Sequence, residues 1–227
     1  MGEARRLIRN TGIIAVGGMA TKLVSFLLLP LYTTVLSTGE YGTVDYISTI
    51  ALFLVPVVSL LMDEAMFRFL IDCNDDRDRT KVVTTSCAVL LIGCAVFAAV
   101  MLAVWLVWRP GNLGWVAALV IVQCLLAMVS AVMRGFGDTV TFAAMNFIAS
   151  LATIVLNVLF IAVFRWGVVG MLAATVIAQG CTAAVFVVRK RLWRFVDAES
   201  LSKTEAREMV RYSLPLIPNK VSWTVMN

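Results

Sequence analysis

The sequence of 227 residues contains no histidine and only 15% charged residues. Histidine is the commonest metal ligand and the most frequent general base, so its absence argues against most hydrolytic and metal-dependent chemistry. An average soluble domain is about 25% charged and about 45–50% apolar. This chain is 61% hydrophobic with a mean hydropathy of +0.92. The shortage of charge excludes an ordinary soluble domain and indicates an all-α, polytopic membrane protein.

Other chemical signatures are missing as well. No glycine-rich phosphate loop follows a predicted strand, and no carboxylate pair sits in a sizeable soluble domain. The segment D-C-N-D-D-R-D, residues 72–78, resembles a calcium loop, but Arg77 replaces the required glycine and Val83 the required glutamate. Four of the five cysteines lie in apolar runs, which does not suggest a disulfide framework. We therefore expect no enzyme, no catalytic residue, no metal and no cofactor.

Long apolar runs are what the sequence does contain. A helix needs roughly 20 apolar residues to cross a hydrocarbon core of about 30 Å. Six runs reach that length, at 11–36, 42–66, 82–108, 113–134, 140–164 and 166–188. A seventh run starts at Ser213 and stops after fifteen residues, too short to span. We expect six transmembrane helices and a chain cut within a seventh, which is typical of a fragment of a longer protein.

Three segments follow from this pattern. Residues 1–195 are predicted to form a six-helix lobe, residues 196–212 a polar connection, and residues 213–227 the start of helix seven. In the connection, Ser202 with Glu205 three residues later forms a predicted capping box. Apolar residues then recur at helical spacing, so we expect a short amphipathic helix on the inner membrane surface.

The distribution of Lys and Arg predicts the orientation. With the N-terminus in the cytoplasm, fifteen of the nineteen cations fall in inside segments and only Arg109 and Arg165 fall outside. The net charge of +5 is therefore explained by cytoplasmic loops rather than by nucleic-acid binding. We expect a multi-pass protein of the bacterial plasma membrane with a cytoplasmic N-terminus.

Two lysines, Lys22 and Lys220, lie inside apolar runs. A charge at the centre of a membrane helix costs about 2.5–3.5 kcal/mol on insertion scales, so such residues usually face a cavity or a partner. Both are candidates for binding an anionic group in a central cavity. The alternatives are a purely structural pairing for Lys22 and snorkelling to the inner interface for Lys220.

Other polar residues in or beside the runs are weaker candidates. Asp45, Asp63 and Glu64 are candidates for ion coupling or for pairing with cations. Asn146 and Asn157 are expected either to line the cavity or to bond between helices.

Two prolines and an arginine are expected to have structural roles. Pro30 and Pro56 lie inside the first two runs and are predicted to kink their helices. Arg134 closes the fourth run, where we expect a positive-inside anchor.

Several blocks resemble the bacterial polysaccharide-biosynthesis flippases, the lipid-linked oligosaccharide translocases. They are the stretch from Leu7 to Tyr46, A-M-F-R-F-L-I-D at 65–72, M-R-G-F-G-D at 133–138, L-N-V-L-F at 156–160 and W-G-V-V-G-M-L-A-A at 166–174. The most specific block is P-L-Y-T-T-V-L-S-T-G-E-Y-G, Pro30 to Gly42.

The resemblance implies a MATE-like fold of two six-helix lobes around a central cavity, of which this sequence supplies the first lobe. It implies an undecaprenyl-pyrophosphate-linked glycan as substrate, with Lys22 and Lys220 holding the pyrophosphate. It also implies membrane lipids, the second lobe and polysaccharide-assembly proteins as partners. An ion-coupled multidrug exporter, a glycan polymerase or ligase, and a non-transporting scaffold are the alternatives. The run Thr11–Leu36 lacks the carboxylate that drug exporters of this superfamily often carry.

Overall fold

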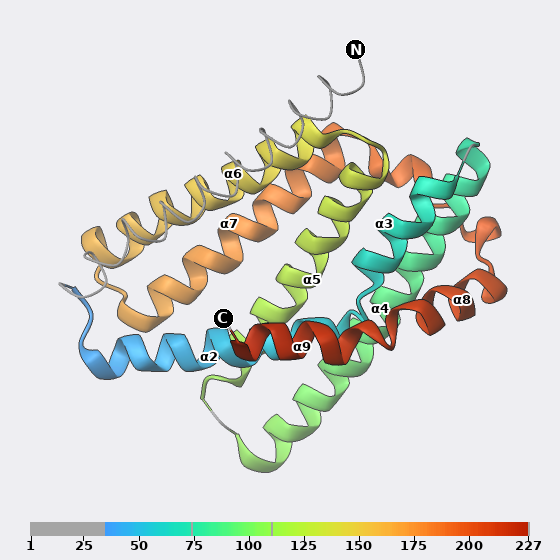
Figure 1. Cartoon of the computed structure of the whole chain (residues 1–227). Coiled ribbons are helices and arrows are strands. Elements are labelled where there is room, and N and C mark those ends of the chain that lie inside the picture. The colour runs from blue at the N-terminus through green and yellow to red at the C-terminus, as the bar shows by residue number, and fades with distance from the viewer. Residues whose placement is uncertain (1–34, 74, 110, 227) are drawn as a thin grey trace.

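The computed structural model describes residues 35–73, 75–109 and 111–226, and these residues contain helices but no strand. Of the predicted first span, 11–36, only the last two residues lie in this part of the chain. Lys22 and Pro30 lie outside it. The longer helices are α2 (Thr38–Val58), α4 (Asp76–Trp108), α5 (Leu113–Gly135), α6 (Thr139–Asn157) and α7 (Gly167–Arg189). The shorter ones are α3 (Met62–Asp72), α8 (Lys203–Ser213) and α9 (Leu216–Met226) (Figure 1).

Five of the described helical segments are long and apolar enough to cross a membrane. They are Thr38–Val58, Asp76–Trp108, Leu113–Gly135, Thr139–Val163 and Gly167–Arg189. A π-helical segment, Val158–Val163, follows α6 directly and continues it without a break. The prediction of an all-α, multi-pass membrane protein is therefore confirmed.

The second predicted span is wrong in one respect, because it is not a single kinked helix. Ser37 caps α2 by accepting a hydrogen bond from the Glu40 amide, and the helix ends at Val58. Leu60 and Leu61 then adopt left-handed backbone conformations, with φ of 50° and 49°. Pro56 has no N–H to donate to the preceding turn, which weakens the helix just before it ends. The chain restarts as α3, and this break shapes the cavity described below.

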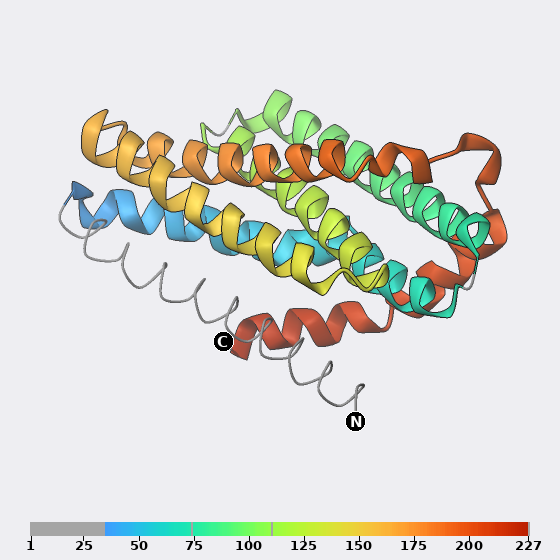
Figure 2. The same cartoon turned by 90° about the horizontal axis from the view of Figure 1, so that it is seen from above.

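Helix α5 lies at the centre of the bundle and packs against α2, α3, α4, α6 and α7. Its buried residues include Leu119, Val120, Cys124 and Met133. Helices α6 and α7 run side by side, while α3, α4 and α8 gather on the other side of α5 (Figures 1 and 2). Helix α3 buries Met62, Ala65, Met66 and Leu70, a spacing that places them on one helix face toward the core.

The block M-R-G-F-G-D forms the turn between α5 and α6. Gly137 has a φ of 73°, which glycine adopts without strain, and the Asp138 amide donates to the carbonyl of Met133 at 3.0 Å. The Asp138 carboxylate then caps α6 by accepting from the Thr141 amide at 3.1 Å, and it pairs with Lys190 at 2.6 Å. Partial burial opposes ionisation, but the bonds from Lys190 and Thr141 outweigh it and lower the pKa of Asp138.

The segment that joins α7 to α8, residues 190–202, is called the strap here. It contains two short 3-10 turns, Leu192–Phe195 and Ala198–Ser200. Thr84 of α4 donates its hydroxyl hydrogen to the Phe195 carbonyl at 3.2 Å and accepts from the Asp197 amide at 3.0 Å. Thr85 accepts from the Ser202 amide at 3.4 Å. These bonds tie the strap to α4.

Helix α8 begins where the sequence predicts, and the Ser202 side chain accepts from the Glu205 amide. Only this half of the predicted capping box forms, because the Ser202 amide donates to Thr85 instead of to Glu205. Its apolar face is covered by protein: α8 packs on α3 and α4, and Met209 is fully buried with its sulfur 3.8 Å from the Ser86 hydroxyl. Lys203, Arg207 and Arg211 lie on the exposed side. Ser213 ends α8, so α9 begins at Leu216, three residues after the predicted start.

Candidate functional site

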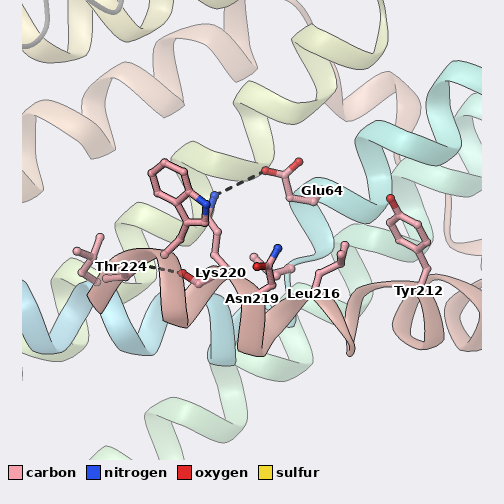
Figure 3. Close-up of a pocket in the computed structure, with 9 residues that line it drawn as sticks. Glu64, Tyr212, Leu216, Asn219, Lys220 and Thr224 are labelled. Atoms are coloured by element: carbon pink, nitrogen blue, oxygen red, sulfur yellow. Dashed lines mark hydrogen bonds and ion pairs between the residues drawn. The ribbon is translucent and has the colours of Figure 1, made fainter. Parts of the chain in front are cut away.

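A cavity of about 700 Å³ lies between the α2–α3 break and the stretch from α8 to α9. Its lining is Leu52, Leu61, Glu64, Tyr212, Leu216, Asn219, Lys220, Trp223 and Thr224. Figure 3 shows Glu64 approaching from α3, while the other labelled side chains come from the α8–α9 stretch. Small-molecule sites commonly occupy about 300–1,000 Å³, so this volume suits a ligand headgroup.

Helical spacing explains how one chain segment supplies most of the lining. Tyr212, Leu216, Lys220 and Thr224 recur at every fourth position and therefore follow one face of the α8–α9 stretch. On the opposite wall, the break after α2 brings Leu61 to the cavity, and Glu64 follows three residues later. The break between α2 and α3 thus forms one wall of the site, and one face of the α8–α9 stretch forms the other.

The polar centre of the cavity is an ion pair between the Lys220 ammonium and the Glu64 carboxylate, 3.9 Å apart (Figure 3). The side chains are 55% and 35% exposed. A contact of this length is too long for a direct hydrogen bond, and an exposed pair contributes only about 0–1 kcal/mol. Lys220 therefore has an accessible positive charge inside a largely apolar cavity.

Arg134 lies in the last turn of α5 and does not line the cavity. Its guanidinium sits 4.9 Å from the ring centre of Phe67 and 5.4 Å from that of Phe142. Its buried Nε has no hydrogen-bond partner among the described residues. Asp63, next to Glu64, interacts electrostatically with Arg134 and with Lys220. The guanidinium of Arg134 thus packs between two aromatic rings.

Of the predicted site residues that the structure describes, Lys220 and Glu64 line the cavity together. Asp63 is adjacent to Glu64 but does not line it, and Asp45 is exposed on α2. Lys22 lies outside the described residues.

The two predicted asparagines are on α6 and do not line this cavity. The Asn146 amide donates to the Phe142 carbonyl at 2.9 Å, within its own helix. Asn157 is 1% exposed, its side-chain oxygen has no partner in the described part of the chain, and the π-helical segment begins directly after it. The structure therefore separates both residues from Lys220.

Sequence reasoning missed Tyr212, Asn219 and Trp223 as cavity residues. The signal was present as the four-residue repeat from Tyr212 to Thr224. It crosses the expected boundary at Ser213, so no single predicted element contained it. The lining combines apolar walls with one cation, one carboxylate and several hydrogen-bonding groups, which suits an amphipathic ligand with an anionic headgroup. No group of three metal-ligating side chains occurs within the described ranges.

The fold is similar to that of solved MATE transporters. An outward-facing multidrug resistance MATE family transporter of the MOP superfamily gives a TM-score of 0.72 at 17% identity, covering 96% of this chain and 53% of that one. A crystal structure of a MATE mutant gives 0.71 at 19% identity, covering 96% and 53%. A MOP superfamily transporter from Pyrococcus furiosus gives 0.58 at 17% identity, covering 95% and 51%.

This chain therefore spans about half the length of those proteins and has the fold of one lobe of a MATE-type bundle. A family profile described as "Polysaccharide biosynthesis protein" matches residues 7–227. The chain belongs to the polysaccharide biosynthesis protein family. A comparison with curated proteins gave no match.

Proposed function

We propose that this chain forms the first lobe, and the start of the second, of a flippase that moves an undecaprenyl-pyrophosphate-linked oligosaccharide across the membrane. The observation that carries the proposal is Lys220, a cation with an exposed head in an apolar-walled cavity of a polysaccharide-biosynthesis family member. Lys220, with Lys22, binds the pyrophosphate. The apolar walls formed by Leu52, Leu61 and Leu216 contact the first part of the prenyl chain.

The proposed transport is alternating access, in which two lobes rock about the bilayer midplane. Polar binding groups between the lobes are exposed first to one side and then to the other. The location is the bacterial plasma membrane, with the N-terminus and the strap on the cytoplasmic side, as the distribution of Lys and Arg favours. The partners are membrane lipids, the second lobe and other polysaccharide-assembly proteins, and the protein acts as a carrier rather than an enzyme.

Reconstitution tests this proposal. The full-length protein with both lobes, purified and placed in liposomes with a fluorescent undecaprenyl-pyrophosphate oligosaccharide, should move the probe to the leaflet that a membrane-impermeant quencher reaches. Lys220→Ala should slow this movement by about 10-fold or more, because a hydrogen bond to a charged group contributes about 1.5–3 kcal/mol. Lys203→Ala, on the exposed side of α8, should leave the rate unchanged and is the matched control.

Equal rates for wild type and Lys220→Ala would contradict the role of Lys220. Movement of a cationic dye but not of the lipid-linked probe would instead support the ion-coupled exporter, with Glu64 as the cation-binding residue in the cavity. Movement of neither probe would support a scaffold.

A further inference from the structure

The Glu64–Lys220 pair connects two parts of the chain that are far apart in sequence. Glu64 belongs to α3, whose other face is buried in the first lobe against α5. Lys220 belongs to α9, which packs against α2 and makes few other contacts within the described bundle. The pair therefore spans the cavity and connects α9 to α3 through the group that the proposed function assigns to the ligand.

We propose that Glu64 is an internal competitor for Lys220, which a phosphate-bearing headgroup must displace in order to bind. This inference rests on the proposed function and adds a specificity-determining residue to it. An ammonium carries one positive charge, so close contact with a phosphate oxygen and with Glu64 at the same time would leave two anions sharing one cation. Binding of the headgroup consequently breaks the Glu64–Lys220 contact between α3 and α9.

The geometry suits an exchangeable contact. The 3.9 Å separation is longer than a direct hydrogen bond, and both side chains are partly exposed. Such a pair is weak in water, whereas a phosphate carries more charge and more acceptor oxygens than a carboxylate. A headgroup can therefore replace Glu64 without breaking a buried bond.

The charged neighbours determine where Glu64 is left after displacement. On its own helix, Asp63 is adjacent and Arg68 is paired with Asp72 at 2.5 Å. From α5, Arg134 is held between the Phe67 and Phe142 rings. From α8, Tyr212 lines the same cavity. No other cation lines the cavity in the described part of the chain, so a displaced Glu64 turns to solvent.

A double-mutant cycle tests the competition. Binding of inorganic pyrophosphate and of farnesyl pyrophosphate to the purified protein is measured by calorimetry for wild type, Glu64→Gln, Lys220→Gln and the double variant. Glu64→Gln should tighten binding of both probes by about two- to fivefold, the range of one exposed ion pair. Lys220→Gln should weaken binding by about 10-fold, and the double variant should match Lys220→Gln, because Glu64 acts only through Lys220. Farnesyl pyrophosphate should bind more tightly than pyrophosphate if the site takes a lipid headgroup.

The matched control is Glu208→Gln, which removes the same charge from the exposed side of α8 and should leave affinity unchanged. Weaker binding by Glu64→Gln would overturn the inference, since Glu64 would then position Lys220 rather than compete for it. Equal tightening in the presence and absence of Lys220 would also overturn it, by revealing a general field effect. If wild type bound the two probes no more tightly than Lys220→Gln does, the proposed function itself would be contradicted.

Discussion

At the turn between α5 and α6, the single charged residue Asp138 is held by a local partner and by one distant in sequence. Asp138 caps α6 locally, and its second partner, Lys190, lies 52 residues further on at the end of α7. The pKa of Asp138 is lowered in the folded chain, so the pair contributes its full stabilisation above about pH 4. That stabilisation is lost as the pH falls through the folded pKa.

Asp138→Asn isolates the charge, because asparagine caps a helix about as well as aspartate. We expect it to lower the free energy of unfolding by about 0.5 kcal/mol at pH 7, a small value because both side chains are partly exposed. The difference from wild type should vanish below the folded pKa. Thermal unfolding followed by tryptophan fluorescence at several pH values measures this. Asp76→Asn, in a 3.4 Å pair whose carboxylate is 86% exposed, should have less effect; a constant difference at every pH would contradict the assignment.

At the scale of helices, the end of α2 depends on a close approach to α4. A methyl group on Gly93 would overlap the carbonyl oxygen of Val58, the last residue of α2. Backbone cannot move aside as a side chain can, so the two helices would have to separate.

Gly93→Ala should therefore destabilise the protein by about 1–3 kcal/mol, the cost of overpacking, even though alanine favours helix. Unfolding in a denaturant titration measures the loss. Gly180→Ala is the matched control, because its added carbon would lie 3.9 Å from Val122 in ordinary contact. We expect Gly180→Ala to be neutral or stabilising. A stabilised Gly93→Ala would show that α2 and α4 are further apart than described.

The sequence predicts the bounds of helices that are long apolar runs, because burial in lipid determines them. It does not predict helix breaks that depend on packing between side chains and neighbouring helices. Spans such as 113–134 are recovered almost to the residue, because a long apolar run has only one stable form in a bilayer. The break at Ser59–Leu61 leaves no such signal, since S-L-L is equally compatible with a continuous helix. Pro56 is visible in the sequence and predicts a kink, whereas the close approach of Val58 to Gly93 of α4 is not visible there.

At the scale of the whole molecule, the strap and α8 pack against helices that precede them in the chain. Thr84 binds the strap backbone at both Phe195 and Asp197, and Met209 of α8 is buried. The sequence predicts the amphipathic helix but not the surface that covers it. In the same way, the sequence indicates Lys220 as a cation within an apolar run but not its pairing with Glu64, because the two lie in segments that only tertiary packing brings together.

Thr84→Val keeps the side-chain shape and removes the hydroxyl, so the Asp197 amide loses its acceptor. We expect a loss of about 1–2 kcal/mol and faster proteolysis within residues 192–202. Limited digestion followed by mass spectrometry locates the cleavage. Thr84→Ser should restore protection, and Thr80→Val, whose hydroxyl donates only to the Asp76 carbonyl of its own helix, is the control. Unchanged cleavage of Thr84→Val would show that the strap is held by other contacts.

The hydroxyls on α4 also set an order of events during biosynthesis. Their partners in the strap and α8 are 111 to 123 residues further along the chain. At about 5–20 residues per second, a ribosome needs several seconds or more to deliver those partners after α4 is made. Thr84 and Thr85 lack their tertiary partners throughout that interval. The described bundle consequently reaches its final form only after α8 has been synthesised, so the segment that is made late completes the packing around a helix that is made early.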